Sequence, residues 1–171
     1  REAHMKLYLD MDGVIADFFG GIERFYNVAH WKDLPDRDSS IMALKHTNFF
    51  DTLELFPTSQ ELVDYCRELA GDEYGICSSP LRGDKDNSSY HKRVWLTRYG
   101  FMPQIHNLIF TGAKEAYAVD KITGEPNILV DDKPSNIDRW RNKGGIGIRY
   151  QANQDSLLDL KVNLNNAYTG K

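Results

Sequence analysis

Two aspartates follow a short apolar stretch near the beginning of the chain. Leu7, Tyr8 and Leu9 are typical of a buried strand, and Asp10 and Asp12 come directly after them. Burying carboxylates without a positive partner is costly, so we expect a cation beside them. Because ligands of open α/β sheets bind at the carboxyl ends of the strands, the pair predicts a metal or phosphate site. The alternative is that both aspartates only stabilise a turn and a helix end.

Polar side chains also follow three later apolar stretches, at residues 74–77, 108–110 and 127–130. These polar side chains belong to Ser78, Ser79, Lys114, Asp131 and Asp132. If all four stretches are parallel strands, their carboxyl ends lie at one edge of the sheet. We therefore expect carboxylates, hydroxyls and an ammonium group to converge there. Turn preference alone does not explain the same arrangement after four separate strands.

This combination of groups favours chemistry on a phosphoryl group. Clustered carboxylate oxygens suit a hard cation such as Mg²⁺, whereas the five histidines lack the spacing of zinc ligands. A cation, a lysine and a serine hydroxyl would together spread the charge of a phosphoryl group in transfer. One carboxylate could attack phosphorus, and a second could protonate the leaving oxygen and then activate water.

The elements that must position these groups alternate between strand and helix. Apolar residues recur at helical spacing over residues 15–28, 58–69, 90–99, 135–140 and 156–162, and a last short strand is expected at 146–148. We expect residues 81–89 to form a polar loop, and Thr58 with Glu61 to form a capping box. The alternation predicts an α/β fold with a mostly parallel, Rossmann-like sheet and helices on both faces.

Residues 30–56 interrupt this alternation with short, poorly periodic segments that carry many aromatic side chains. A small helical cap, inserted after the first strand, would explain them. Placed over a polar site, such a cap would exclude water from it. The predicted domains are a core of residues 5–18 and 57–171 and a cap of residues 19–56. For most of the aromatic side chains, packing within the cap is a sufficient explanation.

The composition suits one domain with a small insertion. The chain has 171 residues, of which 41% are hydrophobic, and its net charge of -4 argues against a nucleic-acid polymer as partner. Cys66 and Cys77 each lie within an apolar pattern, so we interpret both as reduced core residues. Reduced cysteines favour an intracellular, cytoplasmic location. No apolar run approaches the length of a membrane span, and no signal-peptide pattern is present. We expect Arg1–His4 to be foreign to the natural chain, which would begin at Met5.

Several motifs resemble those of the haloacid dehalogenase (HAD) superfamily and, within it, the 5'(3')-deoxyribonucleotidase family. The resemblance covers roughly residues 5–149. The motifs are, in order, Asp10-Met-Asp-Gly-Val-Ile-Ala-Asp-Phe18 with Gly20-Gly21, Asn48-Phe49-Phe50, Ile76-Cys-Ser-Ser-Pro80, Lys92 with Trp95, and Asp131-Asp-Lys-Pro134. The resemblance implies a HAD-type core, phosphatase activity and a Mg²⁺ cofactor.

The resemblance also implies roles for the four acidic residues. Asp10 resembles the nucleophile, and Asp12 resembles the general acid/base. Asp10, the backbone carbonyl of Asp12, and Asp131 resemble the ligands of Mg²⁺. Asp132 resembles a residue that supports the metal site.

Further residues resemble those that hold the substrate. Ser78 resembles the hydroxyl that binds the phosphoryl oxygens, and Ser79 resembles a neighbouring phosphate contact. We expect Lys114 to neutralise the phosphate because it follows a strand, and Lys92 is the alternative because it matches a lysine of the family helix. An ordinary exposed lysine is an equally good interpretation of Lys92. Phe18 resembles a residue against which the base of a substrate packs.

We therefore expect a Mg²⁺-dependent phosphomonoesterase of the 5'-nucleotidase type that acts on (deoxy)nucleoside monophosphates through an aspartyl-phosphate. Two departures from the pattern of the family leave the base and the sugar of the substrate undetermined. Gly112 stands where mammalian-type members carry an arginine, and residues 36–44 lack their base-stacking aromatic cluster. Another small phosphate ester, such as a sugar phosphate, is the alternative substrate. A phosphoacceptor or binding domain without hydrolysis is the alternative class, but it would need neither Asp12 nor the insertion.

Overall fold

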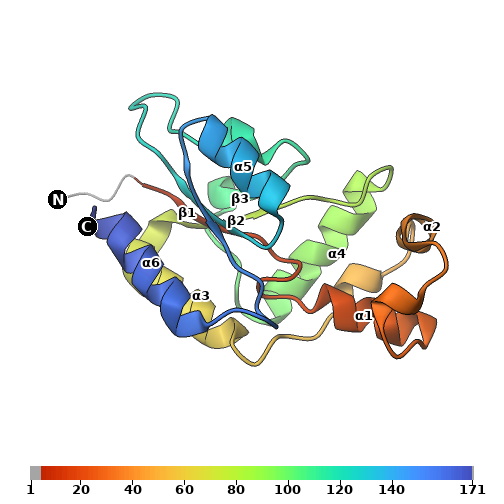
Figure 1. Ribbon diagram of the computed structural model, residues 1–171. Helices are drawn as coiled ribbons and strands as arrows, with labels where there is room; N and C mark the ends of the chain where they lie inside the picture. The colour runs from red at the N-terminus through yellow and green to blue at the C-terminus, as the bar shows by residue number, and fades with distance from the viewer. Residues whose placement is uncertain (1–4, 171) are drawn as a thin grey trace.

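Five parallel strands form one sheet at the centre of the described residues (Figure 1). The structure is a computed structural model that describes residues 5–170, so the segment Arg1–His4, expected to be foreign, lies outside the described residues. The strands are β1 (Leu7–Leu9), β2 (Tyr74–Ser78), β3 (Leu108–Phe110), β4 (Ile128–Asp131) and β5 (Ile146–Arg149). Their order is β3-β2-β1-β4-β5, and neighbouring strands are parallel. The predicted α/β fold with a parallel, Rossmann-like sheet is confirmed.

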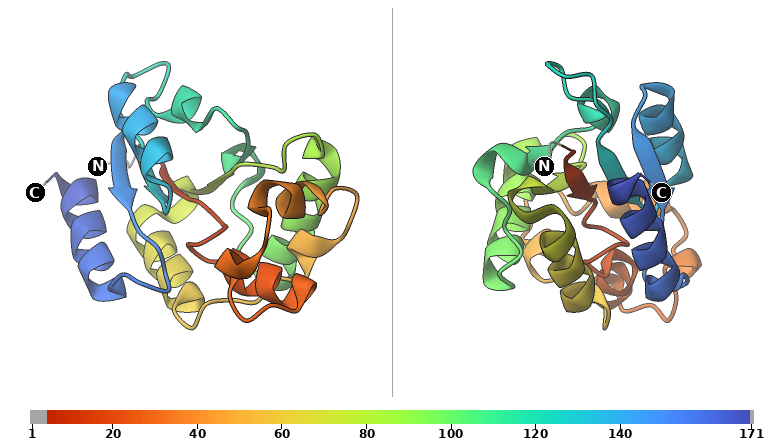
Figure 2. Two further views of the ribbon diagram at one scale, coloured as in Figure 1. Left: turned by 45° about the vertical axis from the view of Figure 1, so that its right-hand side comes forward. Right: turned by 90° about the vertical axis from the view of Figure 1, so that its left-hand side faces the viewer.

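Helices lie on both faces of the sheet (Figures 1 and 2). The α-helices are α1 (Phe18–Tyr26), α2 (Arg37–Met42), α3 (Ser59–Ala70), α4 (Lys85–Arg98), α5 (Pro134–Asn142) and α6 (Leu157–Thr169). Short 3₁₀ helices are η1 (Trp31–Asp33), η2 (Phe49–Asp51), η3 (Gly71–Glu73), η4 (Ile105–Asn107) and η5 (Lys114–Tyr117). Within the described part of the chain, no helix combines the length and the apolar character needed to cross a bilayer.

Alternating side chains of β1 divide the interior into two cores. Leu7 and Leu9 belong to the larger core, to which α3, α4 and α6 contribute. Tyr8 points to the opposite face and packs with Ile137 and Trp140 of α5 in a smaller core. Both faces of the sheet are therefore covered, which agrees with the nearly continuous apolar character of its strands.

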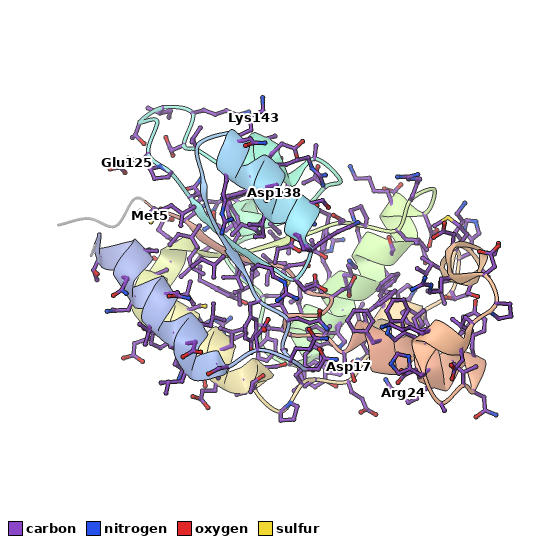
Figure 3. The ribbon with its side chains drawn as sticks, viewed as in Figure 1. Met5, Asp17, Arg24, Glu125, Asp138 and Lys143 are labelled. Carbon is purple, nitrogen blue, oxygen red and sulfur yellow. The ribbon has the colours of Figure 1, made fainter. Side chains whose placement is uncertain are left out.

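The segment of residues 17–55, between β1 and α3, leaves the sheet and returns to almost the same point. It leaves through α1, where the Asp17 side chain accepts a backbone hydrogen bond at the start of the helix (Figure 3). It returns at Leu55, which pairs with Ala16 in an antiparallel bridge. The Trp95 indole of α4 donates to the Leu53 carbonyl at 2.8 Å. This segment contains α1, η1, α2 and η2, and its role as a cap stays a prediction.

Two helix boundaries differ from those predicted from apolar spacing. Helix α1 begins at Phe18, not at Ile15, because the N–H groups of residues 14–16 all donate to the Met11 carbonyl in one tight turn. The next N–H, that of Asp17, then donates to the Glu54 carbonyl outside the helix. Helix α6 continues to Thr169, well beyond the predicted end, because Leu164 extends its buried face.

Two predictions about helix starts are wrong. The polar loop predicted at residues 81–89 ends early, because α4 begins at Lys85. The backbone N–H and the hydroxyl of Ser88 both donate to the Asp84 carbonyl and fix this first turn. The capping box of Thr58 and Glu61 does not form, since Thr58 has helical backbone angles and its side chain makes no capping bond.

Truncation of a buried strand residue should be costly. Ile128 of β4 is fully buried, whereas Ile122 is 95% exposed. We expect Ile128→Ala to lower the free energy of unfolding by about 2–5 kcal/mol, since it leaves a cavity in the core. Ile122→Ala, which removes the same atoms, should change it by less than about 0.5 kcal/mol. Urea unfolding monitored by tryptophan fluorescence measures both, and equal losses would contradict the described core.

Candidate active site

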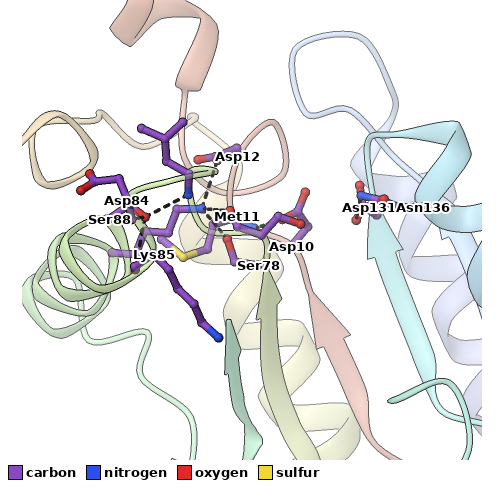
Figure 4. Close-up of polar contacts among 12 residues, drawn as sticks. Asp10, Met11, Asp12, Ser78, Asp84, Lys85, Ser88, Asp131 and Asn136 are labelled. Carbon is purple, nitrogen blue, oxygen red and sulfur yellow. Dashed lines mark hydrogen bonds and ion pairs between the residues drawn. The ribbon is translucent and has the colours of Figure 1, made fainter. Parts of the chain in front are cut away.

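Strands β1 and β4 place Asp10 and Asp131 together at the carboxyl edge of the sheet (Figure 4). Leu9 lies opposite Val130, and the Asp10 N–H donates to the Val130 carbonyl at 2.9 Å. The order of the strands reverses at this point, because β2 and β3 continue on one side of β1 and β4 and β5 on the other. Such a switch point is where open α/β sheets bind their ligands.

Lys114 lies between the two carboxylates. Its Nζ is 3.0 Å from Asp10 Oδ1 and 2.7 Å from Asp131 Oδ2, and all three side chains are buried. Burial lowers the pKa of Lys114, but the two carboxylates outweigh this effect and raise its pKa above the ordinary value. Burial and the charge of Asp131 raise the pKa of Asp10 well above its ordinary value, and Lys114 opposes this shift. Two buried carboxylates thus share one ammonium group.

Asp132 adds a third carboxylate to this pair. One oxygen each of Asp10, Asp131 and Asp132 lies within 4.8 Å of the others. Burial, helped by the charges of Asp131 and Asp12, raises the pKa of Asp132 to about 7. Gly13 leaves room for this carboxylate, because a Cβ there would lie 2.2 Å from Asp132 Oδ2 and the backbone φ is +84°. Glycine is therefore required at this turn.

Lys92 lies at the centre of a second cluster of polar residues, at the end of β2. Its Nζ donates to Ser78 Oγ at 2.7 Å and to the Ser79 carbonyl at 2.8 Å. The same atom lies 3.3 Å from Asp12 Oδ2 and 4.9 Å from the centre of the Phe50 ring. Lys92 is fully buried, so its interpretation as an ordinary exposed helix lysine is wrong. The packing of α4 against η2 and the sheet turns this side chain inward.

Asp12 completes the set with a carboxylate that is only partly satisfied by hydrogen bonds. Its Oδ2 faces Lys92, but its buried Oδ1 has no hydrogen-bond partner among the described residues. A buried polar atom without a partner calls for an explanation, and a carboxylate oxygen here could exchange a proton with a bound molecule. The structure therefore gathers all the predicted polar residues: Asp10, Asp12, Ser78, Ser79, Lys92, Lys114, Asp131 and Asp132.

A cavity of about 790 Å³ opens onto these groups. Its lining includes Asp10, Asp12, Phe18, Phe19, Ser79, Lys114 and Asp132. Ser78 and Asp131 are fully buried and lie behind this lining. The Phe18 ring stacks on Phe50 at 6.2 Å and meets Phe49 edge to face at 5.8 Å. Phe18 is thus a fixed apolar wall beside the carboxylates.

Two residues of α5 reach the same cavity and were not predicted from the sequence. Asn136 donates to Asp131 Oδ2 at 3.1 Å (Figure 4), and Arg139 donates to the Asn136 side-chain oxygen. Both line the cavity. Their signal in the sequence is their place in the first turns of a helix that follows the Asp131 strand, since such turns face a ligand at the carboxyl edge.

The fold is similar to that of solved hydrolases, two of which match nearly the whole chain. A phosphonoacetaldehyde hydrolase-like protein from Oleispira antarctica superposes with a TM-score of 0.50 at 12% identity, over 98% of this chain and 82% of that one. A predicted HAD-like family hydrolase from Porphyromonas gingivalis also gives 0.50, at 13% identity, over 95% of this chain and 98% of that one. These two similarities concern the fold alone.

In sequence, the chain is similar to 5'(3')-deoxyribonucleotidases. It is 28% identical over 152 residues to the mitochondrial 5'(3')-deoxyribonucleotidase of Homo sapiens. The aligned region covers 76% of this chain and 63% of that protein. A putative 5'(3')-deoxyribonucleotidase of Staphylococcus epidermidis is 24% identical, over 81% of this chain and 79% of its own length. The chain thus spans less than two thirds of the human relative. No family model matches the chain. The predicted resemblance to the HAD superfamily and to this family is confirmed.

Glycine at position 13 should be essential for stability. Gly13→Ala would force a side chain to a positive φ and against Asp132, so we expect a loss of about 1–3 kcal/mol or more in the free energy of unfolding. Gly112→Ala is the matched control, because a Cβ at Gly112 meets nothing within 4 Å. Urea unfolding of both variants tests this, and a neutral Gly13→Ala would contradict the close approach of Asp132.

Proposed function

We propose that this protein is a Mg²⁺-dependent phosphomonoesterase that acts on (deoxy)nucleoside monophosphates through an aspartyl-phosphate. The observation that carries the proposal is the meeting of three carboxylates with two buried lysines at one end of the cavity. This arrangement combines a cation site, phosphate-neutralising ammonium groups and a nucleophile. The similarity to 5'(3')-deoxyribonucleotidases supports the nucleotide part of the proposal.

The donor set fits a hard divalent cation. All the candidate ligands are oxygens, which Mg²⁺ prefers. The raised pKa of Asp10 and that of Asp132 reflect burial and mutual repulsion that one lysine does not offset. Asp10, Asp131 and the backbone carbonyl of Asp12 would hold the ion, with Asp132 in support. When bound, Mg²⁺ would supply positive charge to the oxygens of the phosphoryl group.

The side chains themselves account for both steps of hydrolysis. Asp10 attacks phosphorus and forms the aspartyl-phosphate while the ester oxygen departs, and Asp12 gives that oxygen a proton. In the second step Asp12 takes a proton from water, which attacks phosphorus, frees Asp10 and releases inorganic phosphate. Lys92 holds Ser78 and Asp12 in place, and Lys114 orients Asp10. The alcohol and inorganic phosphate are the products.

The substrate is a small phosphate ester held partly by apolar contact. Phe18 offers the cavity a ring fixed by its neighbours, against which a nucleobase could pack. We infer that residues 19–56 act as a cap that carries this ring and excludes water. Two free, buried cysteines support a reducing, cytoplasmic location.

Removal of the attacking charge should abolish turnover. We expect Asp10→Asn to lower kcat at least about 1,000-fold, because the amide is not a nucleophile. Asp12→Asn should lower kcat roughly 100-fold and should accumulate protein heavier by one phosphoryl group, since Asp10 can still attack phosphorus but no carboxylate remains to take a proton from the attacking water. Phosphate release from a panel of nucleoside monophosphates and glucose 6-phosphate, with intact-protein mass spectrometry, measures both effects.

Asp138→Asn, on the exposed side of α5, is the matched control and should leave the rates unchanged. A near-normal rate in Asp10→Asn would exclude the covalent mechanism. Release from glucose 6-phosphate but from no nucleotide would replace the nucleotide substrate by a sugar phosphate. A single equivalent of phosphate without turnover would favour a phosphoacceptor domain.

Metal binding should be measurable without turnover. Added Mg²⁺ at about 100 times its Kd should raise the Tm of metal-free protein by roughly 5–10 °C, because the ion binds only the folded state. In Asp131→Asn this rise should disappear, since a ligand is lost. Differential scanning fluorimetry after treatment with EDTA measures the shift. An equal rise in both proteins would place the ion elsewhere.

A further inference from the structure

The cavity carries more positive charge than the proposed chemistry uses. Besides Lys114, its lining contains the cationic side chains of Arg82, Lys85, Lys133 and Arg139. All four are exposed, and they come from two separate segments, the loop and first turn of α4 and the first turns of α5. The whole chain is acidic, with a net charge of -4. A local excess of cations is therefore a property of this cavity and not of the surface in general.

Three of these cations have no acidic partner. Within residues 5–170, Arg82, Lys85 and Lys133 form no ion pair. Asp84, which lies between the first two in sequence, is buried and accepts hydrogen bonds from the His46 N–H and from Asn87. Its charge is already engaged on the side of the insertion. The cations are thus available to a bound anion.

A hydrogen bond to Asn136 holds the Arg139 side chain beside the cavity. It donates to the Asn136 side-chain oxygen, and Asn136 donates to Asp131 at 3.1 Å. Its contact with Glu115 is longer, at 3.7 Å. A guanidinium in this position can bind two oxygens of one phosphate.

The N-termini of α4 and α5 add positive electrostatic potential to the same cavity. Lys85 and Pro134 stand in the first turns of α4 and α5, and both line the cavity. Neither helix has a side chain that caps its first turn, because Asp84 and Lys133 make no capping bond. The positive end of each helix dipole therefore lies beside the cavity.

The geometry points to a substrate with two phosphate groups, and we propose that the cations at the mouth of the cavity bind the second one. This inference rests on the proposed function. The first phosphate would lie at Asp10, beside the buried side chains of Lys92 and Lys114. The four exposed cations would then bind a second group, farther from the carboxylates. A cavity of about 790 Å³ has room for a nucleoside bisphosphate.

A matched pair of ligands isolates the second phosphate. Adenosine 3',5'-bisphosphate and adenosine 5'-monophosphate differ only in that group. With the Asp10→Asn variant, which leaves both ligands intact, isothermal titration in the presence of Mg²⁺ should give a Kd about tenfold lower for the bisphosphate. The preference should shrink as KCl is raised, because exposed charges are screened. The same preference should be found in kcat/KM of the unmodified protein.

Variants that each remove one positive charge from the cavity test which residues bind the second phosphate. Arg82→Gln and Arg139→Gln should each reduce the preference several-fold, whereas Arg93→Gln, an exposed arginine outside this cavity, should keep it. Equal Kd values for the two ligands, or a preference unaffected by both cavity variants, would overturn the inference. Hydrolysis of the monophosphate by the unmodified protein, measured in parallel, tests the proposed function separately. A protein that hydrolyses the monophosphate but shows no preference would lose only this inference.

Discussion

The site depends on the contact that Lys114 makes with two buried carboxylates. Asp10 and Asp131 lie on neighbouring strands, and without a cation between them their charges would repel each other in a medium of low polarity. One ammonium group is enough to hold the pair together but not to neutralise it. The remaining negative charge is the physical basis of the proposed cation site. Stability and function thus draw on the same electrostatic arrangement.

The topology of the sheet makes this contact possible. Because β4 returns to lie beside β1, residues 121 positions apart become neighbours, and Asp10 and Asp131 leave the sheet at the same edge. The loop after β3 then carries Lys114 across to them, while α4 brings Lys92 to the end of β2. Each ammonium group comes from a different connection. The carboxylates of Asp10 and Asp131 come from the carboxyl ends of two neighbouring strands.

The sequence was sufficient to predict the sheet and the residues at its carboxyl edge. Buried strands leave a local apolar pattern, and Asp10, Ser78 and Asp131 directly follow it, so their convergence could be inferred from parallel pairing alone. The burial of Lys92 could not be predicted in this way, because it depends on which side of α4 packs against the sheet. The place of Asn136 in the first turn of the helix after β4 was a signal, but its contact with Asp131 depends on the geometry of the turn between them. The roles of these residues stay predictions until activity is measured.

The two ends of the segment that follows β1 meet at the Ala16–Leu55 bridge, and the Ser59 hydroxyl donates to the Ile15 carbonyl close by. A chain that departs and comes back at one point can change in length with only a small entropic penalty and without displacing the strands it connects. The proposed cap is thus free to diversify. The carboxylates and lysines beneath it would retain their geometry through such replacements.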